Sequence, residues 1–515
     1  MHQKMLQNQE LTKNKQKILF VAFYDYGSAG IRAIESFIHS NGYKTYTVFL
    51  KENKPNQLIE PTDKEKKLLF DKISEFNPDI IGMSLRSPYF ETVSKITKWI
   101  RDKFPEKIVI WGGSHATMCP EECIKHVDYV VIGEGEYPLL KFIEKRTTDI
   151  KNFWIKKNNE IIKNALGPSI SDLDTLPFPE FTNKCYIEND RLIDEDPIIK
   201  LNKYQIMASR GCPYQCTFCS NAYLRDIFKG KGSFVRRRSV DHVIKELIYV
   251  KKLFKNLSII SFLDEVFTSN KKWIEDFSKQ YKEKINIPFR VLCYPTQVKE
   301  ENIRILRGVG LRLVNMGLQC GSHRVRTEVY KRYTPDEVIL KAAKIFKKYK
   351  LITTYDIIVD NPYETPEDMR ESVNLLIKIP RPYNLRIYSL QNFPKTVLTK
   401  KMIDDGWIKE IGTGIQGFAN GWQGRLNSER SKESLYYICL VSLLSKSFIP
   451  KALVKYFLNV NFFRNHIIAV IILTNLSSKL KMVTYGGSMI LKGEVSFAAF
   501  INHLKNIKTI MLEQR

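Results

Sequence analysis

Apolar and polar positions along the chain fall into two successive series of strand-like and helix-like segments. In the first series, short apolar runs alternate with amphipathic stretches such as 31–39 and 64–76, which predicts a parallel sheet covered by helices on both faces. The expected strands are Ile18–Phe23, Thr45–Leu50, Ile80–Ser84, Ile108–Trp111 and Tyr129–Ile132. Because glycine-marked loops follow these strands, we expect a doubly wound domain at residues 15–150 that binds its ligand at the strand carboxyl ends.

The rhythm of strands and helices breaks between residues 151 and 203. The run Leu176-Pro-Phe-Pro-Glu-Phe is typical of an extended connector, because a proline disfavours the helical conformation of the residue before it. We therefore expect an interdomain linker over this segment.

A second alternating series occupies residues 204–410. Six strand–helix units predict a partial β/α barrel of the TIM type, whose reactive groups lie at the strand carboxyl ends. The expected strands are Tyr204–Ser209, Leu257–Phe262, Phe289–Cys293, Leu311–Gly317, Thr353–Val359 and Asn384–Ser389. In the last region, 411–515, helices are expected at Leu435–Leu444, Ile449–Leu458 and His466–Leu476. The expected fold class is therefore α/β, with a Rossmann-like doubly wound domain, a partial (β/α)6 barrel and a helical C-terminal region.

The chain of 515 residues carries a formal net charge of +26 and contains nine cysteines. No stretch approaches the roughly 18 to 20 uninterrupted apolar residues of a membrane span, and the first residues lack the apolar run of a secretory signal. We therefore expect a cytoplasmic protein. Three clustered and six scattered cysteines do not resemble a paired disulfide framework, and this favours metal binding.

The positive charge would favour anionic partners such as nucleic acid or an anionic membrane surface. Because the lysines are dispersed and no nucleic-acid motif accompanies them, we interpret the charge as solvated faces and do not expect a nucleic-acid partner. Residues Gly424–Arg515 hold 13 Lys and Arg against 4 Asp and Glu. This basic, apolar tail is expected to form a lid over the barrel, and peripheral contact with a membrane is the alternative.

The strongest chemical signal is the segment Gly211-Cys212-Pro213-Tyr214-Gln215-Cys216-Thr217-Phe218-Cys219, which follows the first expected barrel strand. Three thiolates within eight residues converge on one metal centre only if the backbone loops around it, and Gly211 and Pro213 suit such a loop. A [4Fe-4S] cluster held by three thiolates leaves one iron open to a substrate or cofactor. Zinc would usually need a fourth protein ligand, and no Cys or His follows at finger-like spacing.

The C-x-x-x-C-x-x-C spacing, with an aromatic residue before the last cysteine, resembles the signature of the radical S-adenosylmethionine (radical SAM) superfamily. The likeness covers roughly residues 204–407. It implies that Cys212, Cys216 and Cys219 bind a [4Fe-4S] cluster and that S-adenosylmethionine chelates the fourth iron. It also implies that an external donor such as a flavodoxin or ferredoxin supplies the electron that cleaves S-adenosylmethionine to a 5'-deoxyadenosyl radical.

Other segments resemble the cofactor contacts of the superfamily. In Ser261-Phe-Leu-Asp-Glu-Val-Phe, the carboxylates are expected to accept hydrogen bonds from the methionine ammonium, with a helix-capping acid pair as the alternative. The segment Met316-Gly-Leu-Gln-Cys-Gly-Ser322 resembles a strand end near the ribose and carboxylate, although Gln and Cys stand where Glu and Ser are common. The expected S-adenosylmethionine-binding residues are Phe218, Asp264, Glu265, Gln319 and Ser322.

Two further features belong to the expected barrel. Cys320 is expected to be a small buried residue rather than a fourth cluster ligand. The segment Tyr355-Asp-Ile-Ile-Val-Asp-Asn-Pro-Tyr-Glu-Thr365 resembles a fifth-strand loop motif, but Asp360-Asn361 replaces the usual apolar-glycine pair. This departure indicates either polar contact with the substrate or a strand-end turn capped by Glu364-Thr365.

The first domain resembles cobalamin (B12)-binding domains over roughly residues 17–142. Those domains place D-x-H-x-x-G after the first strand, and Gly27 stands at the histidine position, so this site cannot coordinate cobalt. Later strand ends carry glycines that would let the backbone approach a nucleotide tail, and Ser84 offers a hydroxyl. A degenerate domain that has lost the ligand is the alternative. The expected cobalamin-binding residues are Asp25, Gly27, Ser28, Ser84, Leu85, Gly112, Gly113, Ser114, Gly133, Glu134 and Gly135; for His115 we expect a structural or tail-contacting role.

The leading functional hypothesis is a cobalamin-dependent radical SAM methyltransferase that acts on an unactivated carbon between the two domains. The main alternative is a cobalamin-linked oxidative cyclase or rearrangement enzyme of the anaerobic porphyrin-cyclase type, because both share every motif above. An RNA-modifying enzyme is the alternative from another class, but no RNA-binding module is recognisable. The apolar C-terminal helices favour a small hydrophobic substrate. No catalytic side chain is assigned from the sequence.

Overall fold

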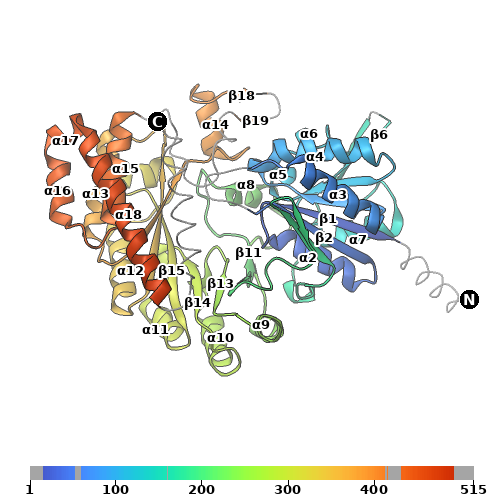
Figure 1. Cartoon of the computed structure of the whole chain (residues 1–515), viewed down its shortest axis with the longest axis horizontal. Coiled ribbons are helices and arrows are strands. Elements are labelled where there is room, and N and C mark those ends of the chain that lie inside the picture. The colour runs from blue at the N-terminus through green and yellow to red at the C-terminus, as the bar shows by residue number, and fades with distance from the viewer. Residues whose placement is uncertain (1–15, 53–58, 159, 412–413, 416–430, 492–515) are drawn as a thin grey trace, which may run out of the picture.

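The computed structural model describes residues 16–52, 59–158, 160–411, 414–415 and 431–491. Two sheets with their covering helices lie next to one another in Figure 1, the first at the right and the second at the left. The expected α/β class, with a Rossmann-like domain, a partial barrel and C-terminal helices, is confirmed.

The first sheet has nine strands in the order β7-β6-β5-β4-β3-β1-β2-β8-β9. Its five central strands are parallel and follow the flavodoxin-like order 2-1-3-4-5, which reverses direction beside β1. These strands are β1 (Lys17–Phe23), β2 (Lys44–Leu50), β3 (Ile80–Ser84), β4 (Ile108–Gly112) and β5 (Tyr129–Val131). They agree closely with the strands expected from the apolar runs.

Helices cover both faces of this sheet because alternate residues of each strand point to opposite sides. In β1, Leu19 and Val21 join one apolar cluster, whereas Ile18 and Phe20 join the other. One cluster includes side chains of α3 (Asp63–Phe76) and α4 (Phe90–Lys103), and the other includes side chains of α2 (Ala29–Ser40) and α7 (Glu136–Lys145). The short helices α5 (Ser114–Met118) and α6 (Pro120–Cys123) follow β4.

The segment expected as a linker, 151–203, contributes four strands to the edges of the first sheet. β6 (Phe153–Lys157) and β7 (Glu160–Lys163) extend the sheet antiparallel beyond β5. At the other edge, β8 (Lys184–Glu188) pairs parallel with β2, and β9 (Arg191–Ile193) pairs antiparallel with β8. These strands are short and partly charged, so they lack the apolar runs that marked the central strands. The chain thus crosses from one edge of the sheet to the other before it enters the second domain.

The second sheet has six parallel strands in the order β10-β13-β14-β15-β16-β17. β17 does not pair with β10 among the described residues, so the sheet forms a partial barrel. The strands are β10 (Lys203–Ile206), β13 (Ile259–Phe262), β14 (Phe289–Cys293), β15 (Leu311–Gln319), β16 (Ile352–Val359) and β17 (Asn384–Ser389). The helices are α8 (Ser220–Ile227), α9 (Val240–Leu253), α10 (Lys271–Lys284), α11 (Glu300–Gly308), α12 (Asp336–Lys348), α13 (Pro366–Lys378) and α14 (Val397–Asp404).

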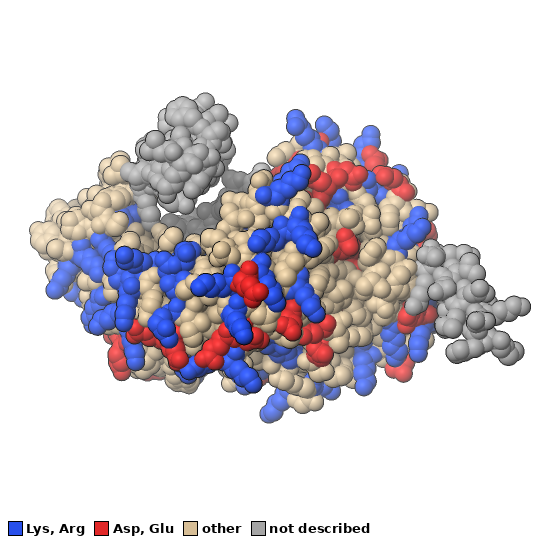
Figure 2. Space-filling view, turned by 90° about the horizontal axis from the view of Figure 1, so that it is seen from below, with Lys and Arg blue, Asp and Glu red and all other residues tan. Residues whose placement is uncertain are grey.

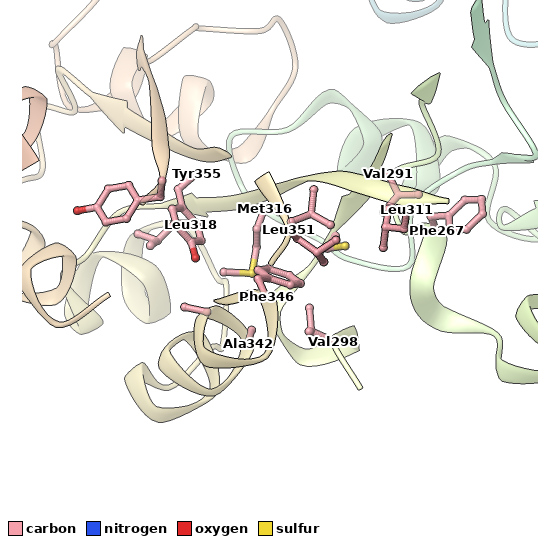
Figure 3. Close-up of a cluster of buried hydrophobic side chains, with 14 of the residues drawn as sticks. Phe267, Val291, Val298, Leu311, Met316, Leu318, Ala342, Phe346, Leu351 and Tyr355 are labelled. Carbon is pink, nitrogen blue, oxygen red and sulfur yellow. The ribbon is translucent and has the colours of Figure 1, made fainter. Parts of the chain in front are cut away.

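The main core lies between the barrel strands and the outer helices. Figure 3 shows part of it, in which Met316 and Leu318 of β15 lie across from Ala342 and Phe346 of α12. All four side chains are buried. This layer holds the strands at fixed spacing, so the loops at their carboxyl ends rest on a rigid frame.

The C-terminal helices continue this core. α15 (Lys432–Leu444) packs on α13 and on α18 (Ile467–Leu491), and α16 (Lys451–Asn459) and α17 (Asn461–Asn465) connect them. Among the described residues, no helix is both long and apolar enough to cross a membrane.

Candidate active site

The three clustered cysteines lie on the loop between β11 (Ser209–Arg210) and α8. β11 pairs with β12 (Arg236–Arg237), so the start of the loop is anchored in a small ribbon. Gly211 has a φ of +87°, and an added Cβ would lie 2.1 Å from the carbonyl oxygen of Phe234. Only glycine fits this position without displacing backbone. At the other end, Cys219 is the N-cap residue of α8. The fold therefore places the thiols at the carboxyl end of the first barrel strand, as the sequence predicts.

The surroundings of Cys212 and Cys219 favour the uncharged thiol. Burial, together with the Glu265 carboxylate, raises the pKa of Cys212 to about 11 and that of Cys219 to about 12. Iron is ligated by thiolates, so the positive charge of bound metal would offset the effects of burial and of Glu265. In the described part of the chain, the three thiols are not among the groups whose ligand atoms all lie within 4.8 Å of one another. A cluster binds each thiolate through a different iron, so wider spacing fits a cluster better than a single ion.

A buried arginine that the sequence did not single out lies beside the loop. Nη1 of Arg332 is 3.7 Å from the Sγ of Cys216, and its guanidinium lies 3.9 Å from the ring centroid of Tyr294. Tyr294 in turn stacks on Tyr214 of the cysteine loop, with centroids 3.6 Å apart. The Nε of Arg332 is buried without a hydrogen-bond partner. This residue offers a fixed cation to an anionic group at the cluster loop; in a chain with 81 Lys and Arg, nothing in the sequence distinguishes it.

The two carboxylates expected to bind the methionine ammonium have different surroundings. Asp264 is fully buried and accepts hydrogen bonds from the backbone nitrogen of Ala208, at 3.1 Å, and from the hydroxyl of Ser209. It therefore anchors the chain just before the cysteine loop. Glu265 keeps exposed surface and accepts one hydrogen bond from Asn221 at 3.0 Å. Protein atoms on several sides reduce its hydration and raise its pKa, which a bound cation would reverse. Glu265 is thus the better placed of the two to bind an ammonium.

The other expected S-adenosylmethionine contacts also differ in whether they are buried or accessible to a ligand. Ser322 is fully buried, and its hydroxyl donates to Asp368 at 2.6 Å. Gln319 is partly exposed at the end of β15, where its φ of +69° and a register shift turn the backbone. Phe218 is partly exposed and packs edge-on against Tyr330, with ring centroids 4.8 Å apart. Gln319 and Phe218 are therefore accessible to a ligand, whereas Ser322 positions its own loop.

The two barrel motifs that departed from the superfamily pattern contact each other. The thiol of Cys320 is buried and donates to the Glu364 carboxylate at 3.1 Å. Burial raises the pKa of Glu364 to about 7. Thr365 caps α13 and forms a capping box with Asp368. Thr365 thus caps the start of α13, and the turn before it is closed by the backbone nitrogen of Glu364, which donates to the carbonyl oxygen of Asn361 at 3.0 Å.

The strand ends of the first sheet meet one another closely. Gly113 has a φ of +96°, and an added Cβ would lie 2.7 Å from both the Ser84 hydroxyl and the Leu85 carbonyl oxygen. The backbone nitrogen of Leu85 donates to the carbonyl of Gly112 at 2.8 Å. The loops after β3 and β4 therefore touch, and only a residue without a side chain fits between them. Ser114, the first residue of α5, stays exposed.

Residues after β1 face the barrel. An added Cβ on Gly27 would lie 2.6 Å from the side-chain oxygen of Gln205 on β10. Asp25 forms an ion pair with Arg86 at 3.3 Å, and Ser28, with a φ of +23°, precedes α2. The position at which related domains carry a histidine is thus next to the second domain.

The loop after β5 joins the two domains by charge. Glu134 pairs with Arg210 at 2.9 Å and with Arg236 at 2.8 Å, and Glu136 pairs with Arg210 at 2.6 Å. Although burial opposes ionisation, the two arginines lower the pKa of Glu134. Gly133, with a φ of +76°, leaves no room for a Cβ beside Phe228. Because Arg210 directly precedes Gly211 of the cysteine loop, the first domain holds the start of that loop.

His115 has protein groups on both sides of its ring. Its Nδ1 lies 2.9 Å from the Ser87 hydroxyl, and its Nε2 lies 3.3 Å from the Glu122 carboxylate. These three residues join the loop after β3 to α5 and α6. The arrangement supports the structural role expected for His115.

The fold and the cysteine loop define a two-domain protein in which a doubly wound domain contacts the first strand of a partial barrel and the start of the cysteine loop. Residues 206–376 match the family model of the Radical SAM superfamily, and residues 16–143 match that of the B12 binding domain. The chain therefore belongs to the radical SAM superfamily and carries an N-terminal B12-binding domain.

Known relatives agree with this assignment. An uncharacterized methyltransferase of Pyrococcus horikoshii is 27% identical over 327 residues, which are 60% of this chain and 66% of the relative. The anaerobic magnesium-protoporphyrin IX monomethyl ester cyclase of Cereibacter sphaeroides is 25% identical over 330 residues, 60% of this chain and 50% of the relative. The chain thus spans between half and two thirds of these relatives.

A solved structure has the same fold. The radical S-adenosylmethionine methyltransferase TsrM of Kitasatospora setae, solved with cobalamin and a [4Fe-4S] cluster bound, superimposes with a TM-score of 0.61 at 15% identity. The match covers 76% of this chain and 78% of that protein.

Proposed function

We propose that this protein is a cobalamin-dependent radical SAM methyltransferase that modifies an unactivated carbon of a small molecule. The observation that carries the proposal is the contact between the two cofactor domains. The strand ends of the B12-binding domain lie against β10, β11 and α8, and Glu134 and Glu136 hold the residue that precedes the cysteine loop. Groups bound to the two domains would therefore face the same space.

The residues present fit these cofactors. Cys212, Cys216 and Cys219 would hold the cluster, because one loop that Gly211 turns brings the three thiols together and the cation of Arg332 lies beside Cys216. For S-adenosylmethionine, Glu265 would accept hydrogen bonds from the ammonium and Arg332 would donate to the carboxylate. Phe218 and Gln319 would line the same site. When bound, the cluster and S-adenosylmethionine supply a carbon radical, and cobalamin supplies the methyl group.

The first domain would hold cobalamin without a protein ligand to cobalt. Gly27 has no imidazole, and the Gln205 side chain occupies the space beside it. Ser84, Gly112, Gly113 and Ser114 would contact the nucleotide tail where the loops after β3 and β4 meet. Asp25, Ser28, Leu85, Gly133, Glu134 and Gly135 complete the proposed set, with Glu134 acting through Arg210 and Arg236.

The inner face of the barrel indicates the chemistry of the substrate. Asp356 lies on the face of β16 opposite to the buried Tyr355 and Ile357, and it forms two hydrogen bonds with Arg386 at 2.7 and 2.9 Å. Burial, and then repulsion from the nearby Arg386, lower the pKa of Arg290 on β14. The Nε of Arg290 is buried without a hydrogen-bond partner. Two guanidinium groups against one carboxylate favour a substrate that carries a carboxylate or phosphate, in addition to any apolar part.

The electron would come from an external flavodoxin or ferredoxin in the cytoplasm. No disulfide bond joins the nine cysteines, all of which lie among the described residues, and this suits a reducing compartment.

Anaerobic reconstitution with iron, sulfide and hydroxocobalamin tests the proposal. We expect iron and cobalamin to bind, S-adenosylmethionine to be cleaved to deoxyadenosine, and the product to gain about 14 daltons. The Cys216→Ala variant should lose iron and deoxyadenosine formation but keep cobalamin. A variant with full iron and undiminished cleavage would contradict the cluster assignment, and wild-type protein that retains no cobalamin would contradict the B12 assignment.

The cyclase is the second candidate, favoured by the likeness to the Cereibacter sphaeroides enzyme. Product mass separates the two activities. Loss of hydrogen or gain of oxygen, without a methyl gain, would replace the methyltransferase proposal with the cyclase.

A further inference from the structure

The C-terminal helices expose a row of large apolar side chains. On α18, Ile468, Ile472, Leu476 and Leu480 are each between 51 and 71% exposed. Their spacing of four residues places them along one side of the helix, and we call this row the apolar ridge. The other side of α18 packs on α15 through buried residues such as Val470. The ridge is therefore not needed to complete the core.

Neighbouring helices extend this apolar surface. Phe448, before α16, Tyr456 of α16 and Phe462 of α17 are between 46 and 57% exposed. α16 contacts α17, and α17 contacts α18, so these side chains and the ridge belong to one end of the molecule, at the left of Figure 1. Water-soluble surfaces rarely gather this many large apolar side chains without a partner.

The sequence of the C-terminal helices is basic after Glu433. From Ser434 to Gly493 the sequence contains no Asp or Glu and seven Lys or Arg: Lys446, Lys451, Lys455, Arg464, Lys479, Lys481 and Lys492. In Figure 2 the same end of the molecule is mostly tan, with blue side chains beside it and red ones along the lower edge. Among the described cations, Lys446 is buried, Lys451 donates to the carbonyl oxygens of Ile377 and Ile379, and Arg464 pairs with Glu433, whereas Lys455 is exposed. A basic, apolar surface is complementary to an anionic surface that can accept hydrocarbon side chains.

Two other occupants lack this complementarity. A second copy of the chain would bring the same excess of basic residues against the first, and like charges oppose such pairing. Residues 492–515 carry four Lys or Arg and only Glu494 and Glu513, so they cannot supply the missing negative charge either.

We propose that the apolar ridge and the exposed aromatic residues of α16 and α17 form a docking surface for the anionic face of a lipid bilayer. On this surface α18 lies in the plane of the membrane, with Ile468 and Ile472 among the lipid chains and Lys455 at the headgroups. The proposal is independent of the reaction, because it requires neither cofactors nor turnover.

Vesicle flotation with the full chain tests this inference. The probes are phosphatidylcholine vesicles with and without phosphatidylglycerol. We expect salt-sensitive binding to the anionic vesicles only. The double variant Ile468→Ser, Ile472→Ser should bind at least about tenfold more weakly, because it loses two apolar side chains that the bilayer would bury. Lys455→Glu should weaken binding about fivefold or more. The matched control is Ile161→Ser, an exposed isoleucine on β7 of the first domain.

Several outcomes would overturn the proposal. These are no binding to anionic vesicles, equal binding to both kinds of vesicle, or wild-type binding by a double variant with unchanged circular dichroism and elution volume. A concentration-dependent dimer that the double variant abolishes, without vesicle binding, would assign the ridge to a second copy instead. None of these readouts depends on methyl transfer, so failure here is distinct from failure of the proposed reaction.

Discussion

Replacing Glu134 with glutamine tests whether the B12-binding domain holds the cysteine loop by charge. The carboxylate accepts hydrogen bonds from Arg210 at 2.9 Å, Arg236 at 2.8 Å and the backbone nitrogen of Ile170 at 2.6 Å. In the variant, Arg210 keeps Glu136, but Arg236 keeps only the carbonyl oxygen of Ile170. A buried guanidinium is then left without a counter-charge.

The cost of Glu134→Gln follows from the burial of this network. Breaking a fully buried ion pair costs about 3–5 kcal/mol. Here the side chains are 15% exposed for Glu134, 25% for Arg210 and 8% for Arg236, and glutamine keeps some hydrogen bonding. We therefore expect the free energy of unfolding to fall by about 2–3 kcal/mol near pH 7.

The pH dependence of this effect has a defined sign. The pKa of Glu134 is lowered in the folded protein, so its stabilisation is present above the ordinary carboxyl value and is lost as pH falls through the lowered one. The difference between wild type and Glu134→Gln should therefore shrink on acidification.

Urea unfolding of the full chain and iron per chain after reconstitution are the measurements. Glu300→Gln, which removes a surface pair with Lys348, is the control and should leave both unchanged. The reasoning is refuted if Glu134→Gln matches that control in stability and in iron content.

Three further substitutions probe the site. Gly211→Ala should lower stability and iron content, because the added Cβ meets the Phe234 carbonyl. The control Gly230→Ala, also at positive φ but with no atom within 4 Å, should load iron normally. Equal iron content in both variants would contradict the argument. Arg332→Gln should raise about tenfold or more the S-adenosylmethionine concentration for half-maximal deoxyadenosine formation, and an unchanged value would remove this residue from the cofactor site. Glu364→Gln should raise the free energy of unfolding at pH 8 by about 2–3 kcal/mol but not at pH 4. The reason is that the carboxyl pKa is raised to about 7, so the wild type loses stability as pH rises through that value. Urea unfolding midpoints of both proteins at the two pH values test this prediction.

The central strands and the cysteine loop could be predicted from the sequence because local patterns specify them. Buried parallel strands are continuous apolar runs, and β3 has the bounds expected from such a run; β14 and β17 also have the expected bounds, although each includes an arginine. The loop could be located because Gly211 and three thiols are adjacent in the chain. The edge strands within 151–203 could not be predicted from the sequence, because β7 and β9 pair on one side only and carry charged residues.

Contacts between distant segments account for what the sequence could not indicate. Arg332 lies 116 residues from Cys216, and Arg210 lies 74 residues from Glu136. The acidic pair Asp264-Glu265 was recognised, but only its surroundings separate the buried Asp264 from the accessible Glu265. Composition does not reveal such differences, because residues with the same charged group differ here in burial and in the distant segments that they contact.

The chain between β10 and the first cysteine is held from both domains. Asp264 of the barrel binds Ala208 and Ser209, while Glu134 and Glu136 of the B12-binding domain bind Arg210, the next residue. Gly211 then turns the chain into the thiol loop. Because the anchors act on consecutive residues, a shift of the loop after β5 must either break an ion pair or move the start of the cysteine loop. The position of the cluster ligands therefore depends on how the B12-binding domain is seated, and this dependence follows from charge and backbone geometry without any ligand shared between the two domains.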